Sequence, residues 1–482
     1  MKKYSFLILV ILVILASCND ILEEEPKAIF VLGYYNTAEE VEAGVNAIYS
    51  KYQSSLYQGF FPAWLECQSD LLLGRPGIDF DYQSLPGFGL QFVENYWGAF
   101  YLSIRNANLI IKYAPNGSKI SAVDIARYVG EAKFMRALSY FHLVRLWGGI
   151  PIRTEINMTE SDVPRSTEDE VYQLIIDDLK DAETNLPDEP SAIGRPSKWA
   201  AKTLLADVYF YQRLNEEASA KAKEVIQSGK YSLVEVTKWQ DFDSKLYGTN
   251  VIGGSTESIF SNMNTKSGTE LRSTVFIDYN HAAAGYSGGR GDWLCHMDSI
   301  IFPVYNNWDN KDIRKDLLYL FDIGLGEGTF LSRKFIDPAA GGGTSGHDFP
   351  LYRYADVLLL YSEASCLVNN GPTADGLEAL NQVHRRAYGK NPTTQPSDVD
   401  FKLADYNAQS FVDLVMKERG YETLFEAKRW FDIKRSGRLK EFVKANKNGI
   451  VVSDNFLLWP IPNAEMNYNK AIDPTTDQNP GY

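Results

Sequence analysis

Histidine and cysteine are scarce in this sequence. Its 482 residues include five histidines and four cysteines. The histidines form no HExxH or HxH motif, and the cysteines, at positions 18, 67, 295 and 366, form no CxxC pair. No zinc site or disulfide framework follows from such spacing, so we expect neither a metal nor another cofactor.

Positive charge is also in short supply. Lysine and arginine number 48 against 62 aspartates and glutamates, which gives a formal net charge of -14. Nucleic acid is therefore excluded as a partner, because its recognition needs a basic surface. Aromatic residues, in contrast, make up 13% of the chain. Most of these rings should pack in the core, but tryptophan and tyrosine also build binding surfaces that stack on sugars.

The apolar run from Phe6 to Ala16 is too short to span a bilayer comfortably, which takes ~20 residues. Two lysines precede it, and Leu15-Ala16-Ser17-Cys18, which follows directly, resembles a bacterial lipobox. We predict that residues 1–17 are a lipoprotein signal peptide and that Cys18 is lipidated, since two or more acyl chains make a durable anchor. The alternative is a plain secretory signal in which Cys18 is incidental.

Residues 18–36 are interpreted as the lipidated tether and entry segment. The acidic stretch Asn19–Lys27 is either a solvated linker or an export signal similar to those of surface lipoproteins in Bacteroidetes.

Motifs for catalysis are weak throughout the chain. A GxSxG match at 285–289 lies in Gly-rich sequence without the strand and helix that a nucleophile elbow needs. The pairs Asp79/Asp81 and Asp309/Asp312 are at most weak candidates for calcium. Several acidic and basic residues follow one another at three- and four-residue steps, which predicts helix ion pairs rather than a catalytic pair: Glu418, Arg419, Glu422, Glu426 and Arg429.

Helical periodicity dominates the chain. Phe134, Leu138 and Phe141 recur on one side of a helix that Gly148 and Pro151 end. The clearest helical hairpin, 196–229, has the small-residue spacing of a tetratricopeptide repeat. We predict three further helix pairs: 37–53 with 95–113, 122–147 with 167–186, and 353–368 with 373–388.

Irregular sequence separates these pairs. Residues 71–92 are predicted to form a long loop, rich in Gly, Pro and rings, whereas Trp97 should lie in the core. Residues 236–346 are predicted to be irregular, with short extended pieces at Ser258–Met263 and Thr274–Tyr279. One long helix is predicted over Phe411–Leu439, and the C-terminal tail should be extended.

Five blocks carry a resemblance to a known family: GEAKFMRALSYFHLVRLWGGIP, RPSKWAAKTLLADVYFY, YRYADVLLLYSEA, ERGYETLFEAKRWFDIKRSGRL, and LWPIPNAEM with QNPGY. Together they resemble the SusD/RagB family of Bacteroidetes. The resemblance implies a mainly α fold, with four tetratricopeptide-like helix pairs and a loop-rich part carrying short strands. It also implies an N-terminal helical part, 37–235, and a C-terminal part, 236–482, within one compact unit.

The resemblance implies a surface-exposed lipoprotein of the outer membrane with no catalysis of its own. Such proteins bind a nutrient glycan, deliver it to a SusC/RagA-like TonB-dependent transporter and act as its lid. Two alternatives stay open: a RagB-like lid that binds peptide, and a surface glycoside hydrolase, which needs only two carboxylates placed in space.

The family's ligand residues lie in variable loops, so the resemblance does not transfer them. By chemistry alone, we nominate rings and one donor on the two long loops as ligand contacts: Arg75, Tyr82, Phe88, Tyr286, Trp293, Tyr305 and Trp308.

Overall fold

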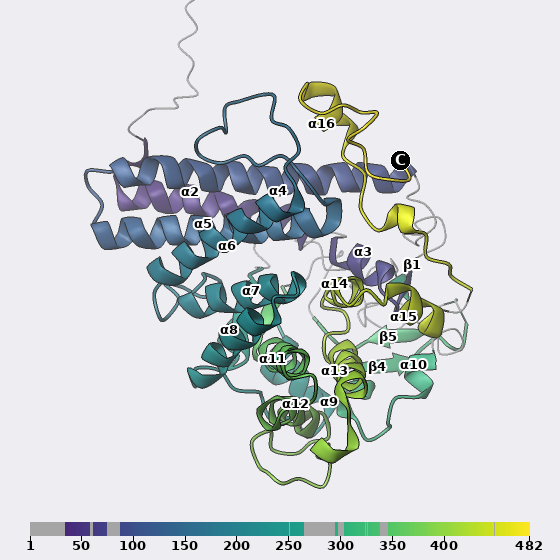
Figure 1. Ribbon diagram of the computed structural model, residues 1–482. Coiled ribbons are helices and arrows are strands. Elements are labelled where there is room, and N and C mark those ends of the chain that lie inside the picture. The colour runs from purple at the N-terminus through teal and green to yellow at the C-terminus, as the bar shows by residue number, and fades with distance from the viewer. Residues whose placement is uncertain are drawn as a thin grey trace, which may run out of the picture.

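The computed structural model describes residues 34–57, 61–74, 87–249, 251–264, 295–296, 303–322, 324, 326–337, 346–447 and 449–482. Within these ranges the fold is mainly helical, and its strands are short (Figure 1). None of the helices described there is long and apolar enough to cross a lipid bilayer.

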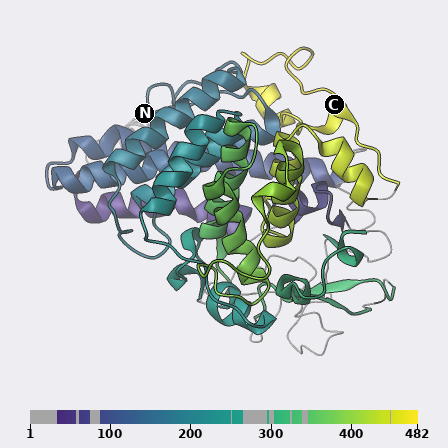
Figure 2. The same cartoon turned by 60° about the horizontal axis from the view of Figure 1, so that its bottom comes forward.

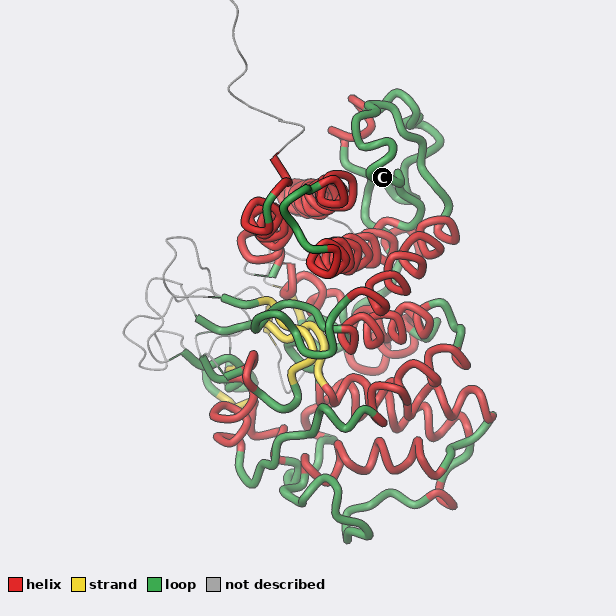
Figure 3. Tube along the Cα trace, turned by 90° about the vertical axis from the view of Figure 1, so that its left-hand side faces the viewer, coloured by secondary structure: helices red, strands yellow, loops and turns green. Residues whose placement is uncertain are grey.

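Four helix pairs form the scaffold, as the sequence predicts. They stack beside one another, so that most of the red helices in Figure 3 run as a series of layers. The pairs are α2 (Ala38–Lys51) with α4 (Gly87–Tyr113), α5 (Ala122–Trp147) with α6 (Glu168–Asn185), α7 (Lys198–Tyr211) with α8 (Asn215–Gln227), and α11 (Tyr354–Asn369) with α12 (Ala374–Ala387).

Helix α5 lies between α4 and α6 and is largely buried. The Ser121 side chain accepts a hydrogen bond from the backbone of Asp124 and caps the first turn. From Phe134 to Trp147 every residue is buried, which explains why its sequence is apolar on more than one side. Gly148 ends the helix with a φ of 73°, a conformation that favours glycine.

Tight packing of α7, α8 and α11 depends on small side chains. Ala218 and Ala222 on α8 are fully buried, and so are Ala200 and Ala201 on α7. Such residues let helix axes approach closely, which accounts for the tetratricopeptide-like spacing of this hairpin.

The remaining elements are short. The strands in the described part of the chain form three two-stranded antiparallel sheets: β1 (Leu73–Gly74) with β3 (Cys295–His296), β2 (Ser258–Asn262) with β6 (Phe349–Arg353), and β4 (Leu318–Leu320) with β5 (Phe330–Ser332). The other helices are α3 (Phe61–Gln68), α9 (Trp239–Phe242), α10 (Pro303–Asn306), α13 (Ala408–Glu422), α14 (Arg429–Arg435), α15 (Leu439–Asn446) and α16 (Asn463–Tyr468). The strand predicted near Ser258 is confirmed, whereas 274–279 lies outside the described residues.

The prediction that 71–92 is one long loop is wrong at its C-terminal end. Helix α4 begins at Gly87, well before the predicted start at 95. Gly and Pro make this stretch a poor helix by propensity, but the Phe92 ring lies 5.8 Å from Trp64 and 6.2 Å from Tyr96. Aromatic packing therefore overrides local propensity here. Trp97, as predicted, is buried.

The single helix predicted over 411–439 is also wrong. The chain breaks after Glu422 and resumes at Arg429, and a second break separates α14 from α15. In the intervening turn Phe425 and Ala427 adopt positive φ angles of 66° and 59°, which a helix cannot contain. Buried charged groups hold this turn, and local periodicity carries no information about them.

The C-terminal tail returns to the N-terminal helices. Trp147 Nε1 donates a 2.9 Å hydrogen bond to the carbonyl of Pro460, and the Trp459 ring packs 5.0 Å from Trp147. Asn479 donates to the carbonyl oxygens of Trp147 and Trp459. Figure 2 shows the yellow C-terminal segment beside the ends of the blue helices. The tail thus closes the core, but the prediction that it is extended is wrong in part, because it contains helix α16 and several turns.

Candidate functional site

Two ring-rich segments of the sequence adjoin the same two-stranded ladder. Strand β1 pairs with β3 in an antiparallel ladder, Leu73 opposite His296 and Gly74 opposite Cys295. The segment 75–86 follows β1 directly, and the segment 265–294 ends directly before β3. The ladder therefore joins stretches that lie more than 200 residues apart in sequence, and we define the β1–β3 base as the candidate binding site.

Helix α3 packs against both strands of this base. All eight of its residues are buried. The chain directly after the helix is held by an ion pair. Arg429 Nε and Nη2 donate to the two carboxylate oxygens of Asp70, at 2.7 and 2.8 Å. Burial opposes ionisation of Asp70, but Arg429 holds the pKa of that carboxyl below its usual value. Lys447 adds a 2.7 Å hydrogen bond to the carbonyl of Cys67.

Glu66 on α3 is a buried carboxyl of a different kind. Its Oε1 accepts a 2.7 Å hydrogen bond from the backbone of Ala427, and its Oε2 has no hydrogen-bond partner among the described residues. Burial raises the pKa of Glu66 to about 8. At neutral pH the group is therefore mostly protonated in the folded protein.

This pKa predicts a pH-dependent stability that Glu66→Gln should remove. The carboxyl titrates at 4.5 when unperturbed, so the folded state binds more protons than the unfolded state between pH 4.5 and 8, and stability falls as pH rises through that window. We expect the free energy of unfolding of Glu66→Gln, relative to that of wild type, to increase by roughly 2 kcal/mol or more from pH 5 to pH 9. A tenfold change in a protonation constant corresponds to about 1.4 kcal/mol.

Urea unfolding of both proteins at the two pH values measures this gain. Glu441→Gln is the matched control, because Glu441 is exposed and paired with Arg438 on the surface. If the free energies of unfolding of Glu66→Gln and wild type differ by the same amount at pH 5 and pH 9, Glu66 is ionised in the folded protein at both pH values.

A hollow of about 240 Å³ lies where the second segment begins. It is lined by α2 and by the end of β2, among others by Asn46, Tyr49, Gln53 and Met263. Gln53 Nε2 donates to the carbonyl of Met263, and Arg195 donates to Glu131 and Glu42 at 2.5 Å. Polar groups and rings thus converge beside the chain that enters 265–294.

Two nominated rings lie in the described part of the chain. Tyr305 is half-buried, with its ring 4.1 Å from Phe330 and the Lys315 ammonium 4.5 Å above it. Trp308 is only 4% exposed, stacks on Tyr421 at 3.9 Å and donates from Nε1 to Asp312 at 2.8 Å. Tyr305 fits a surface contact, whereas Trp308 packs in the interior, unlike the exposed ring we expected.

The other nominated side chains cannot be placed. Arg75, Tyr82, Tyr286 and Trp293 lie outside the described residues, as do the GxSxG match and the pair Asp79/Asp81. Phe88 falls in the first turn of α4, but its side chain is not described.

The second acidic pair has partners of its own. Asp312 accepts three further hydrogen bonds from the Arg314 side chain, at 2.7, 3.0 and 3.2 Å, and Asp309 accepts one from Tyr388 at 2.9 Å. Within the described ranges no three acidic, histidine or cysteine side chains gather as a metal site would require.

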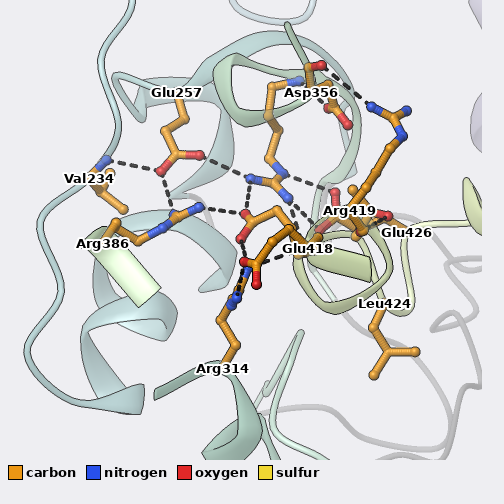
Figure 4. Close-up of polar contacts among 12 residues, drawn as sticks. Val234, Glu257, Arg314, Asp356, Arg386, Glu418, Arg419, Leu424 and Glu426 are labelled. Atoms are coloured by element: carbon orange, nitrogen blue, oxygen red, sulfur yellow. Dashed lines mark hydrogen bonds and ion pairs between the residues drawn. The ribbon is translucent and has the colours of Figure 1, made fainter. Parts of the chain in front are cut away.

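Glu418 and Glu422 on α13 and Glu426 in the turn after it belong to a buried ionic network (Figure 4). Arg353 donates to Glu257 and Glu422 at 3.0 Å and to Glu426 at 2.7 and 2.9 Å. The other pairs are Arg386 with Glu257 and Glu422, Arg314 with Glu418 and Glu422, and Lys334 with Glu426. Ion pairs are thus confirmed, but their partners come from distant segments, not from the same helix as we predicted.

This network also fixes the ionisation of its carboxylates. Burial opposes their charge, but the surrounding guanidinium groups lower the pKa values of Glu418 and Glu422 to about 2. Their contribution to stability is therefore complete above their unperturbed pKa of 4.5 and is lost as the pH falls toward 2. Carboxylates that are fully paired in this way hold the α13–α14 turn and are poor proton donors.

Stacked helix pairs, with a β1–β3 ladder that joins distant parts of the chain, define a helical-repeat scaffold. Comparison with known proteins identifies its kind. Residues 324–482 match the SusD family, and residues 90–210 match a family described as "Starch-binding associating with outer membrane". Two separate segments of the chain thus resemble SusD-like proteins, which supports its membership of the SusD-like family.

Relatives match over most or all of the chain. SusD-like protein P2 of Formosa agariphila is 28% identical over 100% of both chains, and a SusD-like protein of Bacteroides ovatus is 24% identical over 90% of this chain and 82% of its own. A solved SusD homolog from Bacteroides thetaiotaomicron shares the fold with a TM-score of 0.76 at 23% identity, covering 94% of this chain and 98% of that one. A structure described as a laminarin-binding SusD-like protein has a TM-score of 0.70 at 23% identity, over 93% and 100%.

Proposed function

We propose that this protein binds a nutrient glycan and passes it to a SusC-like TonB-dependent transporter of the outer membrane, for which it acts as a lid. The pairing of β1 with β3 carries the proposal. Through that ladder two ring-rich segments share one base, and a rigid scaffold that presents several rings together is the usual architecture of a sugar-binding surface.

Similarity to glycan-binding proteins supports the choice of ligand. One matched family is described as starch-binding, and a neighbour of the same fold as laminarin-binding. We propose Arg75, Tyr82, Phe88, Tyr286, Trp293 and Tyr305 as the glycan contacts. Trp308 is left out because its ring is buried.

Absence of catalysis is part of the same proposal. Glu418 and Glu422 on α13 and Glu426 in the turn after it are each paired with arginine or lysine, so they serve the fold and not a hydrolytic reaction. The sugar would thus be captured intact and released into the transporter.

Calorimetry of the soluble protein, begun after Cys18, tests the ligand class. We would titrate it with starch, laminarin and other oligosaccharides and with oligopeptides. A saturable glycan signal supports the proposal. Binding of peptides alone would favour a RagB-like peptide lid instead.

Anchoring at Cys18 gives a further prediction. Cys18→Ser should move the protein from the membrane fraction to the soluble fraction and abolish incorporation of labelled palmitate, because the thioether and amine-linked acyl chains require the thiol. Fractionation of the native host cells measures both effects. Ser17→Ala, which keeps a small residue before the cysteine, is the control and should stay membrane-bound. Retention of Cys18→Ser in the membrane would contradict the anchor.

A further inference from the structure

A second hollow, of about 630 Å³, lies at a different end of the molecule from the β1–β3 base. Its walls come from residues 231–235, 244–245 and 251–256, the start of α11, and the chain around 391–393 beyond α12. Figure 1 places α9 and α12 at the lower end of the molecule, whereas β1 lies at its right side near α3. Sites for small ligands have volumes of roughly 300–1,000 Å³, so the hollow is large enough for one.

Rings and hydroxyl groups line this hollow. Tyr231, which is half-buried, stacks against Tyr354 at 6.4 Å with an interplanar angle of 28°. The polar lining is rich in groups that both donate and accept hydrogen bonds: Ser232, Ser244, Ser255, Thr256, Gln382 and Thr393. A flat ring with surrounding hydroxyl and amide groups matches a sugar, whose faces are apolar and whose edges carry hydroxyls.

The two charged side chains in the lining are opposite in sign, and both already have hydrogen-bond partners within the protein. Asn391 Nδ2 donates to Glu235 Oε1 at 2.5 Å, and Lys245 Nζ donates to the backbone carbonyl of Glu235 at 2.6 Å. With one carboxylate and one ammonium, the lining has no excess charge to attract an ion. A neutral ligand is therefore favoured over an acidic or a basic one.

The rear wall is held by the buried ionic network. Val234 donates its backbone N–H to Glu257 Oε1 at 2.9 Å, and Tyr354 donates its own to the Glu257 carbonyl at 2.8 Å. Figure 4 shows Val234 and Arg386 meeting at the Glu257 carboxylate. A wall fixed in this way is preformed, so a ligand does not bear the cost of ordering it.

Backbone hydrogen bonding argues against a peptide in this hollow. Ser232 donates its backbone N–H to Thr256 at 3.0 Å, and the N–H of Val234 is used by Glu257. The 231–235 segment thus has these donors occupied within the protein, whereas a peptide that adds as a strand needs them free.

We propose that this hollow is a second, separate binding site for a short neutral saccharide of one or two sugar rings, with Tyr231 as the stacking surface. The proposal goes beyond the glycan site at the β1–β3 base and shares with it only the class of ligand.

Hydrogen–deuterium exchange with maltose, cellobiose and laminaribiose at millimolar concentrations tests it, because peptic fragments report the two sites separately. We expect slower exchange in 231–236 and 251–256. Tyr231→Ala should raise the half-saturating sugar concentration about fivefold, because one aromatic contact contributes about 1 kcal/mol. Tyr468→Ala is the control, since Tyr468 on α16 is 82% exposed and lies outside the hollow.

Three outcomes overturn the proposal: no protection of these fragments by any of the sugars, protection that Tyr231→Ala leaves unchanged, or protection by trialanine in place of sugars. If Tyr231→Ala does not fold, Gln382→Ala replaces it. Protection confined to the fragments around β1 and β3 supports the glycan site there and overturns the second site. Protection confined to 231–236 and 251–256 supports the second site and overturns the glycan site at the β1–β3 base.

Discussion

Replacement of Arg353 by methionine is expected to lower the free energy of unfolding by about 3–5 kcal/mol, the usual cost of leaving buried charges without their partner. Arg353 is fully buried and is hydrogen-bonded to Glu257, Glu422 and Glu426. Without the guanidinium group, these carboxylates would share fewer positive charges in a site that water does not reach. Urea unfolding followed by circular dichroism measures the loss.

Arg438→Met is the matched control for this change. Arg438 also pairs with carboxylates, but its side chain is 27% exposed and that of its partner Glu441 is 60% exposed. Solvent screens such a pair, so we expect a loss below about 1 kcal/mol. Similar losses in the two variants would mean that the buried network contributes no more than a surface ion pair does.

Trp293→Ala is expected to weaken glycan binding by about 30-fold, because a tryptophan at the centre of a binding surface commonly contributes 2 kcal/mol or more. Trp293 precedes β3 by two residues in the sequence, at the end of the segment 265–294. Stability should change little if the ring serves the ligand. Calorimetry with the glycan found in the panel gives the affinity, and urea unfolding gives the stability.

Trp308→Ala should behave in the opposite way. Its ring is buried against Tyr421, so its removal should cost about 3–5 kcal/mol of stability, as truncation of buried aromatic residues does. Glycan affinity at temperatures where the variant is folded should remain close to wild type. A glycan affinity unchanged in Trp293→Ala but lost in Trp308→Ala would move the site away from the β1–β3 base.

The helix pairs could be predicted because their information is local. Phe134, Leu138 and Phe141 repeat with the helical period, and Gly148 ends α5 where a left-handed residue is needed. Helix α3 was missed because it has eight residues, a proline at its second position and no polar face, so no period is visible.

The candidate site was predictable only in part. The sequence marks 71–92 and 236–346 as ring-rich, but not which rings face outward. Trp308 and Tyr305 lie three residues apart in similar sequence, yet only Trp308 meets a ring from α13. The same limit applies to the ionic network, in which Arg353 and Glu426 are 73 residues apart. Contacts of this kind depend on the tertiary fold, which a single sequence does not display.

The short ladder between β1 and β3 has a consequence for how such a protein can diversify. Anchoring of the base depends on α3, Asp70 and Arg429, none of which belongs to the ring-rich segments themselves. Substitutions within 75–86 or 265–294 therefore leave those anchoring contacts intact. If the glycan contacts lie in these two segments as we propose, ligand preference and foldedness can be inherited separately, and one helical framework can be adapted to a new nutrient by exchanging two stretches of chain.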